Sequence, residues 1–157
     1  MPDGLDVIVV DDDRITLELL AEAINTFYTW GDVYVFSDPG EAAYYCNNRE
    51  THIAVFVVDV FLGGETGFRF LDSLAERYPG VYEDAVVITG DASEEVVNAC
   101  LASGISHLLE KPVRPYALQF AVRAVVNKYI SFLRKLREDP GFCRECDSFL
   151  AQLETRR

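Results

Sequence analysis

The stretch Ile53-Ala54-Val55-Phe56-Val57-Val58-Asp59 is an unbroken apolar run that ends in a single carboxylate. Continuous runs of β-branched and aromatic residues are typical of a strand that is buried on both faces, as in the centre of a parallel sheet. In open α/β sheets, ligands bind outside the carboxyl ends of the strands. We therefore expect Asp59 to lie at the functional edge of a parallel sheet.

Segments on either side of this strand predict an alternation of strands and helices. The expected strands are residues 5–10, 33–36, 53–59, 85–88 and 105–109, and the expected helices are residues 15–27, 39–46, 68–77 and 94–102. We expect the first helix to present the stripe Ile15, Leu19, Ala23 and Phe27, and the third to turn Phe70, Leu71 and Leu74 inward. The alternation predicts an α/β fold, a doubly wound five-stranded parallel sheet of the flavodoxin-like order 2-1-3-4-5 with right-handed crossovers.

Polar side chains follow four of the expected strands. Asp11 and Asp12 follow the first strand, Asp59 ends the third, Thr89 follows the fourth and Lys111 follows the fifth. Two like charges about 4 Å apart cost roughly 4 kcal/mol at an effective dielectric near 20, so three carboxylates at one edge require a cation. Oxygen ligands favour Mg²⁺, with Mn²⁺ as the second choice. A carboxylate, a hard cation, an ammonium and a hydroxyl together indicate phosphoryl transfer onto Asp59.

These residues make the chain resemble the receiver domain of two-component response regulators, and it is similar to the single-domain chemotaxis regulators. The resemblance rests on Val9-Val10-Asp11-Asp12, on Asp59 with Gly67 eight residues later, on Thr89-Gly90 and on Lys111-Pro112. It covers roughly residues 5–128. We expect residues 1–128 to be the receiver domain, and residues 129–157 to be an extension of the last helix plus a helical tail, with no separate output domain.

The resemblance implies a role for each of these residues. Asp59 would be the phosphoacceptor for a histidine kinase or a histidine phosphotransfer protein. Asp11, Asp12, Asp59 and the backbone carbonyl of Phe61 would bind Mg²⁺, while Thr89 and Lys111 would contact the phosphoryl group. The Lys111–Pro112 bond would be cis. Such a domain assists its own phosphorylation and hydrolysis, is not otherwise an enzyme, and signals through changed contacts with a downstream protein.

Three positions depart from the family pattern. Gly63 stands where the loop proline is usual, which predicts a more mobile loop. Leu108 stands where the family usually has Tyr or Phe, so the aromatic movement that normally follows the switch at Thr89 is expected to be absent or altered. Phe61 and Asp91 occupy the two positions that tune dephosphorylation. Because an apolar Phe61 cannot position water, we expect a long-lived phosphoryl group.

Two other functions fit parts of the same sequence pattern. The chain could be a receiver-like scaffold or dimerisation module that is no longer phosphorylated, because Leu108 weakens the switch. It could also be a phosphatase similar to the haloacid dehalogenases, with Asp11 as its nucleophile. That family needs an acidic pair after the lysine, and residues 113–137 contain no acid. The aspartate that takes the phosphoryl group distinguishes these functions.

The last predicted helix, residues 115–137, is unusually long. Leu118, Val122, Val125, Tyr129, Phe132 and Leu136 form a heptad stripe along it, and Asp139-Pro140-Gly141 predicts a turn before a short apolar-striped tail. The first half must pack on the sheet. For the second half, the sequence leaves open a hairpin in which the tail folds back over the stripe, a homodimer through the last long helix, and docking of another protein.

Composition and charge limit the partners and the cellular location that we expect for this chain. The net charge is −12, with 5 Lys/Arg against 21 Asp/Glu in residues 1–112 and 9 against 5 in residues 113–157. The acidic residues 1–112 repel nucleic acid, so direct DNA binding is not expected.

No apolar run predicts a membrane span or a signal peptide, and we expect a cytoplasmic protein. Cys143 and Cys146 form an isolated CxxC, for which two incidental thiols are favoured over a zinc or redox site.

Overall fold

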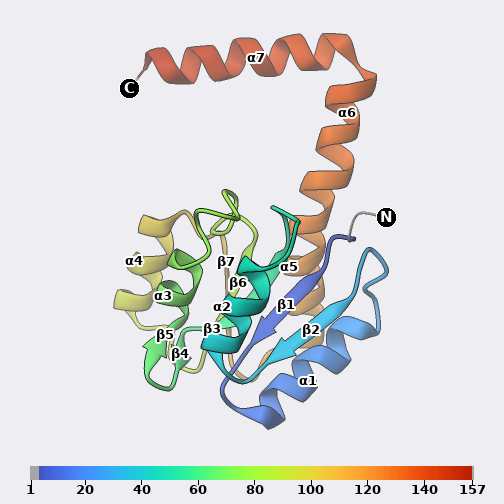
Figure 1. Cartoon of the computed structure of the whole chain (residues 1–157). Coiled ribbons are helices and arrows are strands. Elements are labelled where there is room, and N and C mark those ends of the chain that lie inside the picture. Colours follow the sequence, from blue (N-terminus) through green and yellow to red (C-terminus); the bar gives the residue numbers. More distant parts are fainter. Residues whose placement is uncertain (1–3, 157) are drawn as a thin grey trace. The chain divides into compact units, whose positions relative to one another are not determined.

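The computed structural model describes residues 4–156, which form one compact unit up to Val125 and a second from Val126 onward. The first unit contains a five-stranded parallel sheet (Figure 1). Its strands are β1 (Val7–Val10), β2 (Val33–Phe36), β3 (Val55–Asp59), β6 (Ala85–Thr89) and β7 (His107–Glu110), arranged in the order β2-β1-β3-β6-β7. Counted along the chain this is 2-1-3-4-5, so the predicted topology is confirmed.

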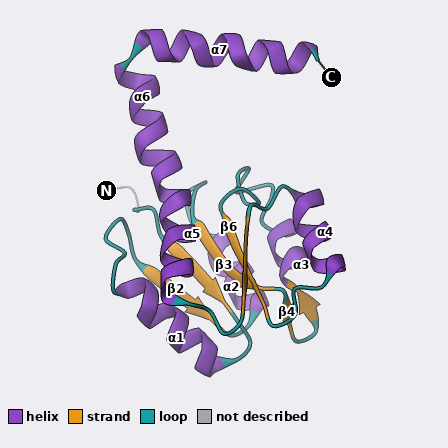
Figure 2. Cartoon of the chain, turned by 180° about the vertical axis from the view of Figure 1, so that it is seen from behind, coloured by secondary structure: helices purple, strands orange, loops and turns teal. Residues whose placement is uncertain are grey.

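Helices cover both faces of the sheet (Figure 2). Helices α1 (Arg14–Asn25) and α5 (Pro115–Asn127) lie on one face, and α2 (Pro39–Asn47), α3 (Gly67–Asp72) and α4 (Glu94–Ser103) lie on the other. Every residue of β1, β3 and β6 is buried. The apolar run that ends at Asp59 is therefore a central strand, as predicted, although it starts at Val55 and leaves Ile53 exposed.

The buried face of α1 differs from the prediction. Leu17, Leu20 and Ile24 are buried, whereas Ile15 is 72% and Leu19 is 61% exposed. At 100° per residue, the predicted stripe with a constant spacing of four drifts by 40° at each step and does not stay on one face. The 3-4 spacing of the buried set keeps its members on one side of the helix, and the predicted stripe was wrong for this reason.

A small hairpin that the sequence did not predict follows β3. Strands β4 (Phe61–Leu62) and β5 (Glu65–Thr66) pair antiparallel around Gly63 and Gly64. Gly63 has φ +70°, a left-handed conformation that proline, fixed near −65°, cannot adopt. Helix α3 also ends at Asp72, five residues before the predicted end, but Phe70, Leu71 and Leu74 are buried as predicted.

The last predicted helix is continuous but not uniformly α-helical. After α5, residues Lys128–Phe132 form a π-helical segment (η1), and α6 (Leu133–Glu138) continues it. Leu118, Val122 and Val125 are buried, as the heptad stripe predicts, while Phe132 is exposed. The π-helical segment interrupts the α-helical spacing on which the heptad stripe depends.

The tail forms helix α7 (Pro140–Thr155), and it does not fold back over α6. The Asp139 side chain accepts a hydrogen bond from the Phe142 amide at 3.0 Å and so caps α7 at a corner (Figure 1). Phe142 packs edge-on against Phe132, whereas Phe149, Leu150 and Leu153 are exposed. Of the three arrangements that the sequence left open for this segment, the fold-back hairpin is not the one observed. Cys143 and Cys146 are free, partly exposed thiols on this helix.

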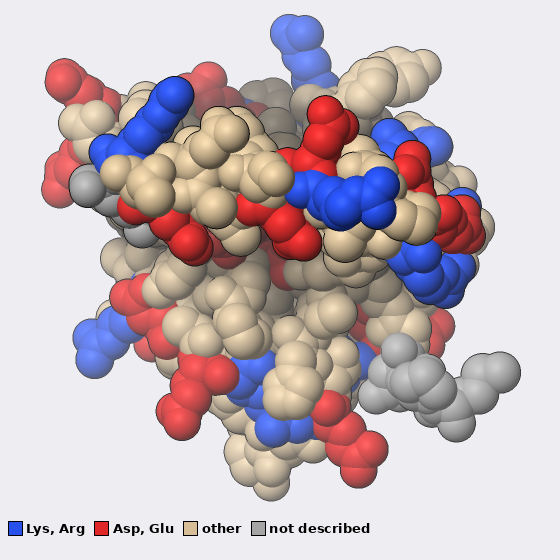
Figure 3. Space-filling view, turned by 90° about the horizontal axis from the view of Figure 1, so that it is seen from above, with Lys and Arg blue, Asp and Glu red and all other residues tan. Residues whose placement is uncertain are grey.

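Acidic and basic residues are mixed at the surface. On the face shown in Figure 3, acidic and basic side chains are interspersed among neutral ones. Within residues 4–156, no helix has both the length and the apolar character that a membrane span requires.

Candidate functional site

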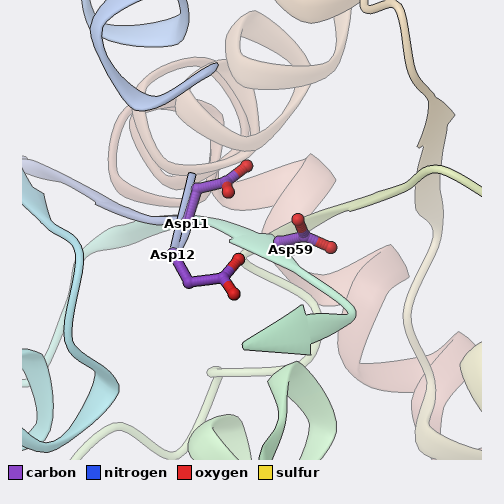
Figure 4. A group of neighbouring side chains, drawn as sticks. All are labelled: Asp11, Asp12 and Asp59. Carbon is purple, nitrogen blue, oxygen red and sulfur yellow. The ribbon is translucent and has the colours of Figure 1, made fainter. Parts of the chain in front are cut away.

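Asp59 is the last residue of β3, and its side chain lies at the carboxyl edge of the sheet (Figure 4). The residue is only 6% exposed. Its Oδ1 accepts a hydrogen bond from the Phe61 amide at 3.0 Å. Gly67 closes the backbone behind it, because a Cβ at this position would lie 2.2 Å from the Asp59 carbonyl oxygen. The strand, the hairpin and this close approach together fix the direction of the carboxylate.

Two more carboxylates reach the same place from the loop after β1. Asp11 is buried and Asp12 is exposed, and one carboxylate oxygen from each lies within 4.8 Å of the others and of one from Asp59 (Figure 4). Asp11 Oδ1 accepts the Asp13 amide at 2.9 Å. The third acid of the run, Asp13, instead caps α1 by accepting from the Ile15 amide and the Thr16 hydroxyl.

Lys111 joins two of the carboxylates. Its Nζ lies 2.5 Å from Asp59 Oδ2 and 2.9 Å from Asp11 Oδ2. Lys111 is positioned from the end of β7, where its amide donates to the Thr89 carbonyl at 2.8 Å and its bond to Pro112 is cis, as the resemblance implied. The ammonium therefore neutralises part of the charge that Asp11 and Asp59 concentrate here.

Burial and the neighbouring charges shift the pKa values of Asp11 and Lys111. Burial raises the pKa of Asp11, and the charge of Asp59 raises it further, while the contacts with Lys111 and the Asp13 amide only partly offset these effects. Burial lowers the pKa of Lys111, but its hydrogen bonds and ion pairs with Asp59 and Asp11 outweigh burial and the net shift is upward. Lys111 therefore stays charged, whereas Asp11 beside it resists ionisation.

The donor set fits a hard divalent cation. Among the described residues, Asp11, Asp12 and Asp59 are the group whose ligand atoms come close enough to share a metal ion. The buried Asp11 Oδ2 is ion-paired to Lys111 Nζ at 2.9 Å, and no other described donor reaches it, so a second lone pair is open to a cation. Three carboxylates with exposed Asp12 at the rim therefore form a site that could hold a metal with open positions.

The remaining predicted site residues lie on β4, β6 and β7 and in the loop after β6. The Thr89 hydroxyl is buried at the end of β6, where it donates to the Asp91 carbonyl at 2.9 Å and accepts the Asp91 amide at 3.1 Å. Leu108 lies on β7 and packs against the core. The side chains of Phe61 and Asp91 are exposed. Thr89 is thus bonded to its own loop in this conformation.

Sequence reasoning missed two contributions to the site. The Phe61 amide donates to Asp59, whereas only the carbonyl of Phe61 had been considered. The Asp13 amide orients Asp11 while its side chain caps α1. The role of Asp13 could have been predicted, because an acid directly before a helix is a typical N-cap. The hydrogen bond from the Phe61 amide depends on the β4–β5 hairpin, and the short sequence between Asp59 and Gly67 has no periodic pattern that predicts a hairpin.

The chain belongs to the response regulator receiver domain family, whose sequence pattern it matches over residues 7–123. An uncharacterised 14.6 kDa protein of Leptolyngbya boryana is 31% identical over 82% of this chain and 92% of its own length. The two-component response regulator PprB of Pseudomonas aeruginosa is 30% identical over 71% of this chain. A CheY-like receiver domain protein from Methanospirillum hungatei has the same fold, with a TM-score of 0.68 at 21% identity over 82% of this chain and 96% of that one.

The match spans only part of the larger regulators. It covers 40% of the length of PprB, and 30% of the cyclic di-GMP phosphodiesterase response regulator RpfG of Xanthomonas campestris, which is 28% identical over 74% of this chain. The shared part is the receiver domain in two-component signalling, and the activities of the larger regulators do not follow from it.

Proposed function

We propose that this chain receives a phosphoryl group on Asp59 in a Mg²⁺-dependent reaction and signals by changed protein contacts. The observation that carries the proposal is the arrangement around Asp59. Its carboxylate is ion-paired to Lys111 at 2.5 Å and grouped with those of Asp11 and Asp12 at the carboxyl edge of the sheet. This combination of a nucleophile, a cation site and a fixed ammonium suits phosphoryl transfer.

In the proposed step, a carboxylate oxygen of Asp59 attacks the phosphorus of a phosphohistidine on a histidine kinase or phosphotransfer protein. An O–P bond forms, the N–P bond breaks, and the leaving imidazole takes up a proton. Bound Mg²⁺, held by Asp11, Asp12, Asp59 and the Phe61 carbonyl, would supply charge neutralisation for the phosphoryl oxygens. Lys111, already 2.5 Å from Asp59, would stabilise the same oxygens through its ammonium.

For the readout, we propose that Thr89 turns toward the phosphorylated Asp59. To do so, its hydroxyl must leave the Asp91 backbone groups that it bonds here, so the loop after β6 changes with it. Leu108 packs in the core and carries no hydroxyl or ring to follow that movement. The signal would then pass through the β6–α4 loop to a downstream protein partner.

The phosphoryl group should be long-lived. Phe61 is 55% exposed next to the cluster, and an apolar side chain there offers no hydrogen bond to an attacking water. Asp91, at the other tuning position, is exposed in the loop after Thr89. A half-life of seconds for the phosphorylated chain would contradict this part of the proposal.

We place these steps in a receiver domain of residues 1–128, with residues 129–157 as its extension, and in a cytoplasmic setting. The acidic composition of residues 1–112 supports a protein partner in preference to nucleic acid.

The test is incubation of the chain with Mg²⁺ and a small phosphodonor, followed by intact mass measurement. One added phosphoryl mass is expected for the native chain, and none for Asp59→Asn or in EDTA. Asp13→Asn is the matched control, because Asp13 caps α1 and asparagine caps equally well. A phosphoryl mass that persists in Asp59→Asn would overturn the proposal.

A further inference from the structure

The unit from Val126 onward exposes more apolar surface than its few residues can cover. On α7, Phe149 is 62%, Leu150 56% and Leu153 44% exposed. The contact between α6 and α7 includes an edge-on pair of Phe132 and Phe142 with ring centroids 5.7 Å apart. About thirty residues in the segments η1, α6 and α7 cannot build an adequate core alone, so an exposed apolar stripe of this kind calls for a partner.

A groove runs along the other helical segment of this unit. It has a volume of about 340 Å³ and is lined by the apolar or aromatic side chains of Tyr129, Ile130 and Leu133 and by the basic side chains of Arg134 and Arg137. The described partner of Arg137 is the exposed side chain of neighbouring Glu138, at 3.3 Å. An exposed pair of this kind contributes little and is readily exchanged for another carboxylate.

Helix α7 carries the complementary pattern. At 100° per residue, Phe149, Leu150 and Leu153 share one face, and Asp147 and Glu154, seven residues apart, border that face on the side of Leu150. An apolar stripe with an acidic edge matches a groove lined by apolar and basic side chains in both chemistry and charge.

The same chain cannot place this stripe in its own groove. Helix α7 starts at the corner after Asp139, where Phe142 already contacts Phe132. The stripe begins seven residues beyond Phe142, or about 10 Å farther along a helix that does not turn back alongside α6 (Figure 1). The groove and the stripe are thus complementary but separated within one molecule.

We propose that a second copy of this chain fills the groove, so that two molecules exchange their α7 helices. The stripe of Phe149, Leu150 and Leu153 from one copy would lie on Tyr129, Ile130 and Leu133 of the other, with Asp147 and Glu154 facing Arg134 and Arg137. The same contact occurs twice about a two-fold axis, which closes the assembly as a dimer.

Sedimentation velocity of the full chain, without a phosphodonor, tests the assembly. The native chain is expected to be a dimer, and Leu150→Asp a monomer that keeps its helical circular dichroism. Leu101→Asp is the matched control, because Leu101 on α4 is 70% exposed but lies outside this unit. A monomeric native chain, or a dimer lost in Leu101→Asp and kept in Leu150→Asp, would overturn the proposal, and docking of another protein would then remain.

Charge exchange tests the pairing itself. Arg134→Glu with Arg137→Glu, or Asp147→Arg with Glu154→Arg, should each raise the dimer dissociation constant about tenfold. All four changes together should restore it to within about threefold of the native value. A quadruple variant as weak as either double variant would contradict the pairing. Asp59→Asn should leave the dimer intact, so this proposal and the proposed phosphorylation can fail separately.

Discussion

Among single residues, Asp11 is the one at which the site lowers the stability of the fold. Its carboxylate is fully buried beside Asp59, and Lys111 at 2.9 Å compensates for only part of that cost. Because burial and a like charge raise its pKa, the folded state holds a proton on Asp11 more tightly than the unfolded chain does. Stability is therefore lost as the pH rises above the unfolded value near 3.9, until Asp11 is ionised in both states.

Asp11→Asn is accordingly expected to raise the melting temperature in EDTA. The gain should be larger at pH 7, where the native carboxylate is driven to ionise, than at pH 4. Thermal unfolding followed by circular dichroism at the two pH values measures it. A lower melting temperature for Asp11→Asn at pH 7 would show that the pair with Lys111 outweighs burial and repulsion.

The strands and their end residues could be predicted from the sequence. Val55 to Asp59 is apolar on both faces, which identifies a central strand, and the parallel topology then brings Asp11, Asp59, Thr89 and Lys111 to one edge. The buried face of α1 was missed because the predicted stripe used a constant spacing of four, whereas the buried residues Leu17, Leu20 and Ile24 follow the 3-4 spacing of one helix face. The β4–β5 hairpin was missed because two-residue strands carry no periodic pattern.

For the helical elements after Asn127, the sequence predicted the helices but not their detailed geometry. The unbroken helical pattern up to Arg137 was correct, but the sequence does not show that residues 128–132 wind as a π-helix. The turn at Asp139-Pro140 was also visible, whereas the direction in which α7 leaves it depends on backbone angles at Asp139. Local patterns predict where such elements start and stop, and tertiary contacts decide how they meet.

At the element scale, the approach of Gly67 to β3 gives a direct test. An added Cβ would lie 2.2 Å from the Asp59 carbonyl oxygen and 2.9 Å from Val58 Cγ1, so the backbone behind Asp59 must shift. Gly67→Ala should lower the free energy of unfolding by about 2 kcal/mol in urea titrations. Gly64→Ala, with no atom within 4 Å of the added Cβ, should stay within about 0.5 kcal/mol of the native chain. Equal losses of stability at the two positions would show that the close approach of Gly67 to β3 does not constrain the backbone.

For the whole molecule, a metal that binds the folded acidic cluster must also stabilise the fold. Mg²⁺ at about 100 times its dissociation constant should add about 2.7 kcal/mol to the free energy of unfolding. Asp12→Asn should remove most of that gain with little effect in EDTA, because Asp12 is an exposed member of the cluster. Urea unfolding with and without Mg²⁺ measures both values. An unchanged Mg²⁺ effect in Asp12→Asn would remove Asp12 from the ligand set.

The position of the phosphoryl group distinguishes Asp59 from the other aspartates of the cluster. After reaction with a small phosphodonor and Mg²⁺, borohydride reduction converts an aspartyl phosphate to homoserine, which peptide mass spectrometry locates in the sequence. We predict homoserine at residue 59 of the native chain and at no other aspartate. Homoserine at residue 11, or an unmodified residue 59 in a chain that has gained the phosphoryl mass, would contradict the assignment of Asp59 as the phosphoacceptor.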